Sequence, residues 1–336
     1  MEITDGRLRL TLHEGIGRFS LSCLSSLKGS TYVPLIVAQD PRTTVLSIVV
    51  GNKVYRMGET SDFSEIVEKT ASGGRFIWKS PLITVTESFT FISSPGSPIS
   101  DGIRIDIKVR NVSEQELSVG IRYLYDTYLG EASFVHFRTH TLSEVAKELT
   151  LSGETVPLFW VSPLSGNVEE FGLQLMSSGE GVTVPDRIVF ANWKRLNDAS
   201  WSYETASSRN FNLLPYSVND SAACHYYDPR PLARGTETTV VIVMGKYTPT
   251  GFALAPRASA ANFDASMRQV LAITKDIDDI ALGVRADIST VNKLMDEIDR
   301  RLASGESASA EEISLMRTVI SDLKARSHRY SPPSGE

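Results

Sequence analysis

The chain has 336 residues, of which 41% are hydrophobic and 22% are charged, a balance typical of globular proteins and unlike that of disordered chains. Its 34 basic and 40 acidic side chains give a net charge of −6, whereas nucleic-acid-binding domains are usually basic. The composition therefore argues against a nucleic-acid partner and leaves both enzymes and binding proteins open.

The first residues, MEITDGRLRLTLHEG, alternate polar and apolar side chains and lack the apolar stretch of a secretory signal. No run of 18 apolar residues occurs, so we expect no membrane span and a cytoplasmic protein. Cys23 and Cys224 are the two cysteines, and a thiolate zinc site needs more of them close together. We predict no metal and no cofactor, since the chain has neither a Walker loop nor a dinucleotide fingerprint.

The first 250 residues carry repeated strand signals. Strands are predicted near 7–11, 17–23, 82–92, 170–176 and 186–190. Apolar runs on both sides of Gly51-Asn52 predict a tight hairpin, because glycine supplies the positive φ that such turns need. Residues 103–109 alternate apolar and charged side chains, and 117–125 continue the alternation after a polar loop, which predicts a second antiparallel hairpin. The run at 238–244 is apolar on both faces, as in a central strand.

Many strands with glycine and proline between them, and no intervening helix, predict a mainly β protein with one large antiparallel β-sandwich. All four tryptophans and thirteen of the fifteen prolines precede residue 261, after which the pattern becomes helical. The expected organisation is a β-sandwich domain at 1–248, a linker at 249–263, a helical coiled-coil region at 264–328 and a disordered tail at 329–336.

The C-terminal region predicts a helical hairpin. A first helix over about 265–302 ends at Gly305, and Ser309 with Glu312 forms a capping-box pattern for the second helix. Apolar residues recur every three or four positions in the first helix, with one four-residue stutter between Val284 and Ile288, as in a coiled coil. The predicted oligomer interface consists of Val270, Ile273, Ile277, Ile280, Val284, Ile288, Val291, Met295, Ile298 and Leu302.

The two predicted helices differ in length. The first spans roughly 57 Å and the second about 27 Å, at 1.5 Å per residue. Because the second helix cannot cover the whole apolar repeat, part of the repeat must meet another surface. Self-association is the first expectation, and packing on the β domain or docking of a different protein are the alternatives.

Asp126, Glu131, His136 and His140 follow the strand predicted at 117–125 and are candidate catalytic residues. Carboxylates and imidazoles this close in sequence can bind a metal or share acid–base work. Their spacing matches no metal motif, and the competing interpretation is that they are turn and core residues.

A second group, Asp220, His225 and Asp228, surrounds a strand predicted at 221–227. No Gly-x-Ser-x-Gly elbow accompanies it, so a structural role is favoured. Candidate ligand-binding residues are Trp193, Trp201 and His13, since exposed aromatic rings can stack on sugars, although tryptophan is more often a partly buried core residue.

The β region contains GRFSL at 17–21, LYDTYLGE at 124–131 and VVIVMGKY at 240–247. It resembles uncharacterised bacterial β-sandwich proteins and is similar to the galactose-mutarotase-like supersandwich. The resemblance covers about 1–250 and implies that fold. In sugar mutarotases two histidines and a glutamate transfer the protons, and the histidines of this chain do not lie in the family's characteristic contexts.

Two functions follow as hypotheses. The first is a non-enzymatic bacterial binding or assembly protein, whose β-sandwich recognises a partner or glycan and whose helices at 265–328 join copies or dock on another protein. The alternative is a carbohydrate-active enzyme of mutarotase or lyase type that uses Asp126, Glu131, His136 or His140. Convergence of these side chains in one open cleft with aromatic walls would favour the enzyme.

Overall fold

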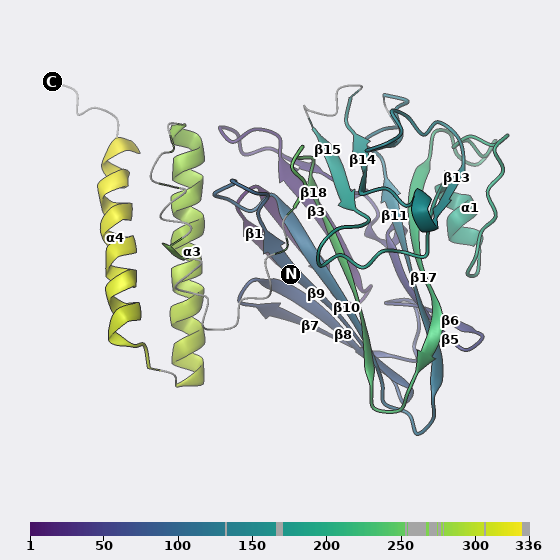
Figure 1. Ribbon diagram of the computed structural model, residues 1–336, viewed down its shortest axis with the longest axis horizontal. Coiled ribbons are helices and arrows are strands. Elements are labelled where there is room, and N and C mark those ends of the chain that lie inside the picture. Colours follow the sequence, from purple (N-terminus) through teal and green to yellow (C-terminus); the bar gives the residue numbers. More distant parts are fainter. Residues whose placement is uncertain are drawn as a thin grey trace.

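The structure is a computed structural model that describes residues 1–131, 133–165, 171–252, 254, 267–268, 274, 277, 279–305 and 307–330. Within them, three antiparallel sheets of four, eight and six strands are followed by two long helices (Figure 1). The predicted mainly β, sandwich-like fold with a C-terminal helical region is confirmed. None of the described helices is long and apolar enough to span a membrane.

The four-stranded sheet opens the chain, in the order β1-β2-β3-β4. In β2, buried leucines alternate with half-exposed polar residues, because successive side chains of a strand point to opposite faces. The strands predicted near 7–11 and 17–23 are β2 and β3. The four strands are β1 Glu2–Asp5, β2 Leu8–His13, β3 Arg18–Leu24 and β4 Tyr32–Pro34.

The eight-stranded sheet has the order β12-β14-β15-β18-β10-β9-β8-β7. β18 lies between β15 and β10, so the prediction of a central strand at 238–244 is confirmed. Its strands are β7 Ser64–Thr70, β8 Gly73–Lys79, β9 Ile83–Ile92, β10 Gly102–Asn111, β12 Arg138–Thr139, β14 Phe159–Pro163, β15 Gly172–Met176 and β18 Glu237–Lys246.

The six-stranded sheet has the order β13-β16-β17-β11-β5-β6. β5 and β6 form the predicted tight hairpin, and Gly51 between them has a φ of 57°, a conformation in which a side chain is strained. The strands are β5 Val45–Val50, β6 Lys53–Arg56, β11 Leu117–Thr127, β13 Leu149–Ser152, β16 Arg187–Asn192 and β17 Ser221–Leu232.

The predicted hairpin between 103–109 and 117–125 is wrong. β10 pairs with β9 and β18, whereas β11 pairs with β5 and β17, so the chain crosses between two sheets at 112–116. Alternation identifies a strand and its two faces, but it does not identify the neighbouring strand. The polar side of β10 is not simply solvated either, because Asp106 is buried in a two-point ion pair with Arg104.

Side chains from all three sheets share the main core, which is rich in aromatic rings. Trp160 and Tyr125, from the two larger sheets, lie 6.3 Å apart between ring centroids. A smaller core covers the outer face of the six-stranded sheet, where Leu196 of helix α1 (Trp193–Asp198) packs on Tyr226 and its neighbours.

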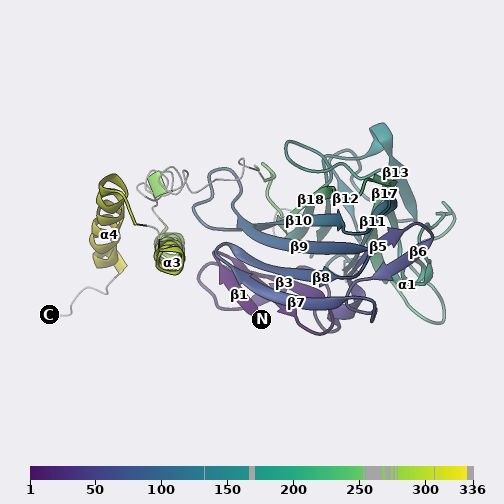
Figure 2. The same ribbon diagram turned by 90° about the horizontal axis from the view of Figure 1, so that it is seen from below.

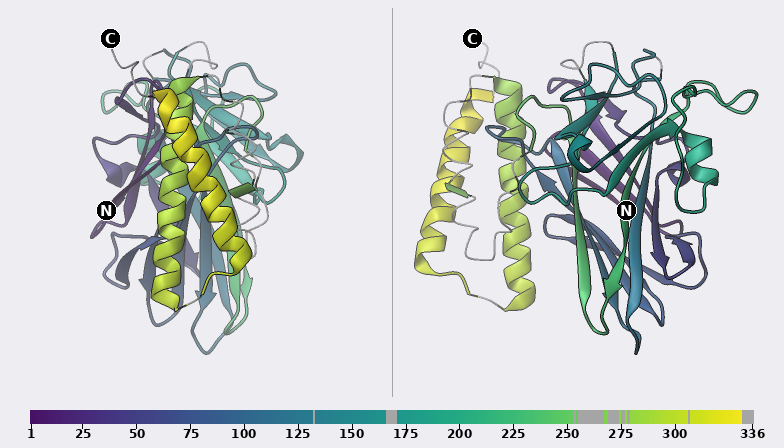
Figure 3. Two further views of the ribbon diagram at one scale, coloured as in Figure 1. Left: turned by 90° about the vertical axis from the view of Figure 1, so that its left-hand side faces the viewer. Right: turned by 45° about the vertical axis from the view of Figure 1, so that its right-hand side comes forward.

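Helices α3 (Ile280–Ser304) and α4 (Ala310–Tyr330) lie side by side, with α3 between α4 and the sheets (Figures 1 and 3). The predicted end of the first helix and the predicted start of the second are confirmed, whereas α4 continues through Tyr330, beyond the predicted boundary at 328. Gly305 ends α3 with a φ of 70°. The Glu312 carboxylate accepts from the Ser309 N–H at 2.7 Å, and the Ser309 hydroxyl accepts from the Glu312 N–H at 3.2 Å. Seen from below, α3 again lies beside the sheets, with α4 farther away (Figure 2).

The predicted continuous helix over 265–302 is wrong, because α3 begins at Ile280. Ile277 and Asp279 are not helical, and the Asp279 carboxylate accepts hydrogen bonds from the N–H groups of Ala281 and Leu282. This is an N-cap, which satisfies the free donors of a helix start. Val270, Ile273 and most of the predicted linker 249–263 lie outside the described residues.

Candidate functional site

A group of three carboxylates lies where the paired strands β11 and β17 meet. Thr127 pairs with Ser221, which brings Asp126 at the end of β11 next to Asp220 just before β17. Glu131 lies in the loop after β11, and its Oε1 accepts a hydrogen bond from the Ser221 N–H at 3.0 Å. Carboxylate oxygens of Asp126, Glu131 and Asp220 lie within 4.8 Å of one another. These three residues are termed the carboxylate cluster.

Burial and mutual repulsion make the cluster hold protons near neutral pH. Burial raises the pKa of Asp126 to about 7, and the neighbouring Asp220 charge adds to the effect. Burial raises the pKa of Glu131 to about 8, with a smaller opposing effect from the Ser221 N–H. The pKa of Asp220 is raised for the same main reason. Carboxyl groups this close titrate as a unit.

Such a cluster can do two kinds of chemistry. A carboxyl group with a pKa near the working pH can donate and accept protons, as a general acid or base does. Several carboxylate oxygens can also hold a hard cation such as Ca²⁺. Among the described residues, the carboxylate cluster is the set of acidic, cysteine and histidine side chains close enough to share one ion.

Two loops border the carboxylate cluster, one between β11 and β12 and one between α1 and β17. They contain strained backbone positions. Among the non-glycine residues of the described chain, Phe134 and Asn219 are the two with positive φ, at 60° and 54°. The loops meet where the His136 ring packs on Phe211, with centroids 4.5 Å apart. Strain of this kind persists where the surroundings impose it, often at functional sites. Several large apolar side chains of these loops are exposed: Phe134, Leu214, Tyr216 and Val218.

In the described part of the chain, the two predicted catalytic histidines make no hydrogen bond to the carboxylate cluster. His136 is buried, burial lowers its pKa to about 4, and its Nδ1 has no hydrogen-bond partner in the described part of the chain. His140 is exposed, and its Nδ1 accepts from the Leu158 N–H at 3.0 Å. Of the four predicted residues, the structure thus brings Asp126 and Glu131 together.

The second predicted group separates. His225 lies in the core, where its Nε2 accepts from the Trp160 indole at 2.9 Å and burial lowers its pKa to about 3. Asp228 pairs with Arg187 at 2.9 Å, while Asp220 belongs to the carboxylate cluster. Both Asp126 and Asp220 lie at strand ends, and antiparallel pairing joins the end of one strand to the start of its neighbour. Position at a strand end could therefore have identified Asp220 as a neighbour of Asp126, but only once the pairing of β11 with β17 is known.

The three candidate sugar-binding residues do not share a face. The Trp193 indole donates to the Thr43 carbonyl at 2.9 Å, and Trp201 packs edge-on against Tyr226 at 6.0 Å. Both tryptophans cover the outer face of the six-stranded sheet. His13 lies on β2 of another sheet and shares a 2.8 Å hydrogen bond with Ser20.

A second candidate site lies on α3. Its polar side faces the β domain, where Arg285 donates to the carbonyls of Leu27 and Gly29 at 2.8 and 2.7 Å. Another side meets α4 through a small apolar core around Leu294 and Val319. The predicted interface residues of α3 remain between 40% and 76% exposed, apart from the half-exposed Val284. The α3 stripe is defined as Ile280, Val284, Ile288, Val291, Met295, Ile298 and Leu302.

No protein-family model matches the chain, and no curated protein is similar to it in sequence. The solved structures to which it is similar include a galactose mutarotase related enzyme from Lactobacillus acidophilus (10% identity, 76% of this chain, 99% of that chain, TM-score 0.45). Others are a galactose mutarotase-like protein from Lactobacillus casei (10%, 74%, 99%, 0.41) and an α-N-acetylgalactosaminidase from Bifidobacterium bifidum (10%, 84%, 40%, 0.43). These likenesses match the weak resemblance expected from the sequence, and no activity follows from them.

Proposed function

We propose that this chain is a non-enzymatic assembly protein in which the α3 stripe joins two copies. The observation that carries this proposal is the orientation of α3. Its polar side contacts the β domain, and its apolar stripe stays exposed. A surface helix normally does the reverse and buries its apolar stripe. The steps from Ile288 to Val291, Met295, Ile298 and Leu302 are three, four, three and four, which is the spacing of a coiled-coil seam.

A second copy is the occupant that this spacing favours. A heptad stripe is complementary to itself around a twofold axis. Full burial of one such side chain contributes about 1.5–3 kcal/mol, so seven half-exposed side chains on each of two helices contribute roughly 10–20 kcal/mol. Association costs about 4–15 kcal/mol. The stripe is therefore of the size that a dimer needs.

The test is the mass of the full chain in solution, measured by light scattering over a range of concentrations. We expect a dimer or larger assembly for the unaltered chain and a monomer for Ile288→Asp, since an unpaired charge in an apolar seam is costly. The dissociation constant should rise by roughly 100-fold or more, equivalent to about 2.7 kcal/mol.

The matched control is Val184→Asp, which places the same charge on an exposed apolar residue of the β domain. This variant should keep the mass of the unaltered chain, and both variants should keep its circular dichroism spectrum. An unaltered chain that is monomeric at every concentration, or an Ile288→Asp chain of unchanged mass, contradicts the proposal.

A second candidate function is acid–base catalysis on a carbohydrate by the carboxylate cluster. Two adjacent carboxyl groups with pKa values near 7 and 8 favour it, since catalytic acids and bases are tuned toward the working pH. In this candidate active site Asp220 joins Asp126 and Glu131, and His140 has no catalytic role. Turnover of hexoses and uronides should fall at least about 100-fold in Glu131→Gln. An unaltered chain that is inert toward the whole panel removes this candidate.

A further inference from the structure

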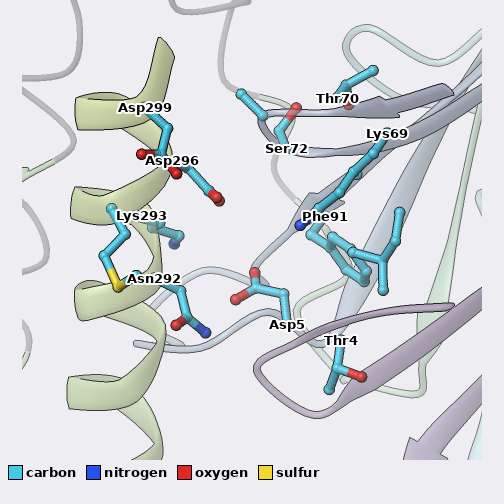
Figure 4. Close-up of a pocket in the computed structure, with 14 residues that line it drawn as sticks. Thr4, Asp5, Lys69, Thr70, Ser72, Phe91, Asn292, Lys293, Asp296 and Asp299 are labelled. Carbon is cyan, nitrogen blue, oxygen red and sulfur yellow. The ribbon is translucent and has the colours of Figure 1, made fainter. Parts of the chain in front are cut away.

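A cavity of about 420 Å³ separates the polar side of α3 from the β domain. One wall consists of the end of β1, the turn between β7 and β8, and Phe91 on β9, while α3 provides the other wall (Figure 4). The volume lies in the range of small-molecule sites, which are common where two domains meet. Contacts that hold α3 near this cavity are polar, such as the 2.9 Å hydrogen bond from Ser289 to Asp5.

The cavity carries an excess of negative charge. Its charged lining consists of Asp5, Asp296 and Asp299 against Lys69 and Lys293. Figure 4 shows the carboxylates of Asp5 and Asp296 projecting from opposite walls into the space between them. Neither Asp296 nor Asp299 has an ion-pair partner among the described residues. Burial raises the pKa of Asp296, the Lys69 ammonium opposes this, and the Asp299 and Asp5 carboxylates add to it.

The cavity also has an apolar part, formed by Phe91 and Met295. A site with both parts suits an organic ligand that has a positive group and a hydrocarbon chain. An anion would be repelled by the three carboxylates, and a neutral polyol would leave their excess charge unbalanced. A bare metal ion is also a poor fit, because the described acidic side chains close enough to share one ion belong to the carboxylate cluster, elsewhere in the fold.

We propose that this cavity binds a small aliphatic amine. Its ammonium group lies between Asp5 and Asp296, and its hydrocarbon chain lies against Phe91 and Met295. Asp5 and Phe91 belong to the β domain, whereas Asp296 and Met295 belong to α3. A bound amine therefore contacts both parts and stabilises their docked arrangement by mass action. The ammonium contacts use the polar side of α3, and Met295 belongs to both the cavity lining and the α3 stripe. The site does not require the assembly proposed for the stripe.

The test is titration calorimetry of the full chain with n-butylamine at constant ionic strength. We expect saturable binding at one site per chain, and at least about tenfold weaker binding for Asp296→Asn, which removes one charge and keeps the side-chain size. The matched control is Asp322→Asn, an exposed aspartate of α4 outside the cavity, which should bind as the unaltered chain does. Val284→Asp, a variant of the α3 stripe at a residue outside the cavity lining, should also bind normally, which separates this test from the test of assembly.

Three results would overturn the proposal. The first is a binding heat with potassium chloride equal to that with n-butylamine, because charge screening alone would then explain the heat. The second is equally tight binding of 1-butanol, which has the same hydrocarbon chain and no charge. The third is unchanged affinity in Asp296→Asn, which would place the amine at another site. Circular dichroism of each variant confirms that the chain is folded.

Discussion

Replacing Asp126 by asparagine is expected to raise the free energy of unfolding at pH 8 by about 4 kcal/mol. Burial holds the pKa of Asp126 at about 7 in the folded chain, against 3.8 for a free side chain. The folded state therefore prefers the protonated form. The stability of the folded state is therefore not reduced by Asp126 below about pH 4, and it falls as the pH rises toward 7. Asparagine removes the charge and keeps the shape, so the Asp126→Asn chain should not show this loss of stability with rising pH.

The measurement is urea unfolding of the unaltered chain and of Asp126→Asn between pH 5 and pH 8. The quantity compared is the difference between their free energies of unfolding at each pH. The difference is needed because Glu87 is also buried, with a pKa raised to about 7, and contributes to the pH dependence of both chains. Asp322→Asn, an exposed substitution of the same kind, should follow the unaltered chain. If Asp126→Asn is instead destabilising by the same amount at every pH, the carboxylate is a structural hydrogen-bonding group.

A gain in stability at this position would bear on function. Groups that destabilise a fold are retained where the destabilising arrangement is useful, and stabilising substitutions there usually cost activity. Asp126, Glu131 and Asp220 bring three carboxyl groups together, with oxygens within 4.8 Å of one another, an arrangement that packing alone does not favour. If Asp126→Asn is more stable and a binding or catalytic activity is lost with it, the carboxylate cluster is the functional site.

The sequence predicts local structure here better than it predicts pairing. Periodicity correctly locates β10, β11 and the central β18, and glycine at position 51 correctly locates a hairpin. It fails at 112–116, because a polar five-residue loop can join two strands of one sheet or cross to the facing sheet. The helix start is missed for a related reason. The apolar repeat continues through Ile277, but Asp279 caps a new helix at Ile280.

The carboxylate cluster shows the same limit. Asp126 and Glu131 are close in sequence, and the sequence predicts them as one group, whereas Asp220 is 94 residues after Asp126 and reaches them through the pairing of β11 with β17. The exposure of the α3 stripe also depends on tertiary structure. The spacing of Ile288, Val291 and Met295 predicts an apolar stripe, but only the docking of Arg285 on the β domain shows that the polar side of α3 is held there while the stripe stays exposed.

Glu148→Ala should reduce the free energy of unfolding by about 3–5 kcal/mol, which is the cost of breaking a buried ion pair from one side. The Glu148 side chain is buried and accepts hydrogen bonds from Arg195 at 2.8 Å, from the Tyr203 hydroxyl at 2.9 Å and from the Ala206 N–H at 3.0 Å. Its removal leaves the half-buried Arg195 without its carboxylate. Glu148→Gln keeps acceptor and size, so it should lose less.

The effect should extend to the carboxylate cluster. Arg195 also donates to the Asn212 carbonyl at 2.8 Å, and the Asn212 side chain accepts from the Asn219 N–H at 2.6 Å, directly before Asp220. Urea unfolding gives the stability, and the pH dependence of unfolding reports the cluster. Glu154→Ala, at an exposed glutamate nearby, is the control and should change neither. If Glu148→Ala lowers stability while the pH dependence stays as in the unaltered chain, Arg195 holds the fold together without positioning Asp220.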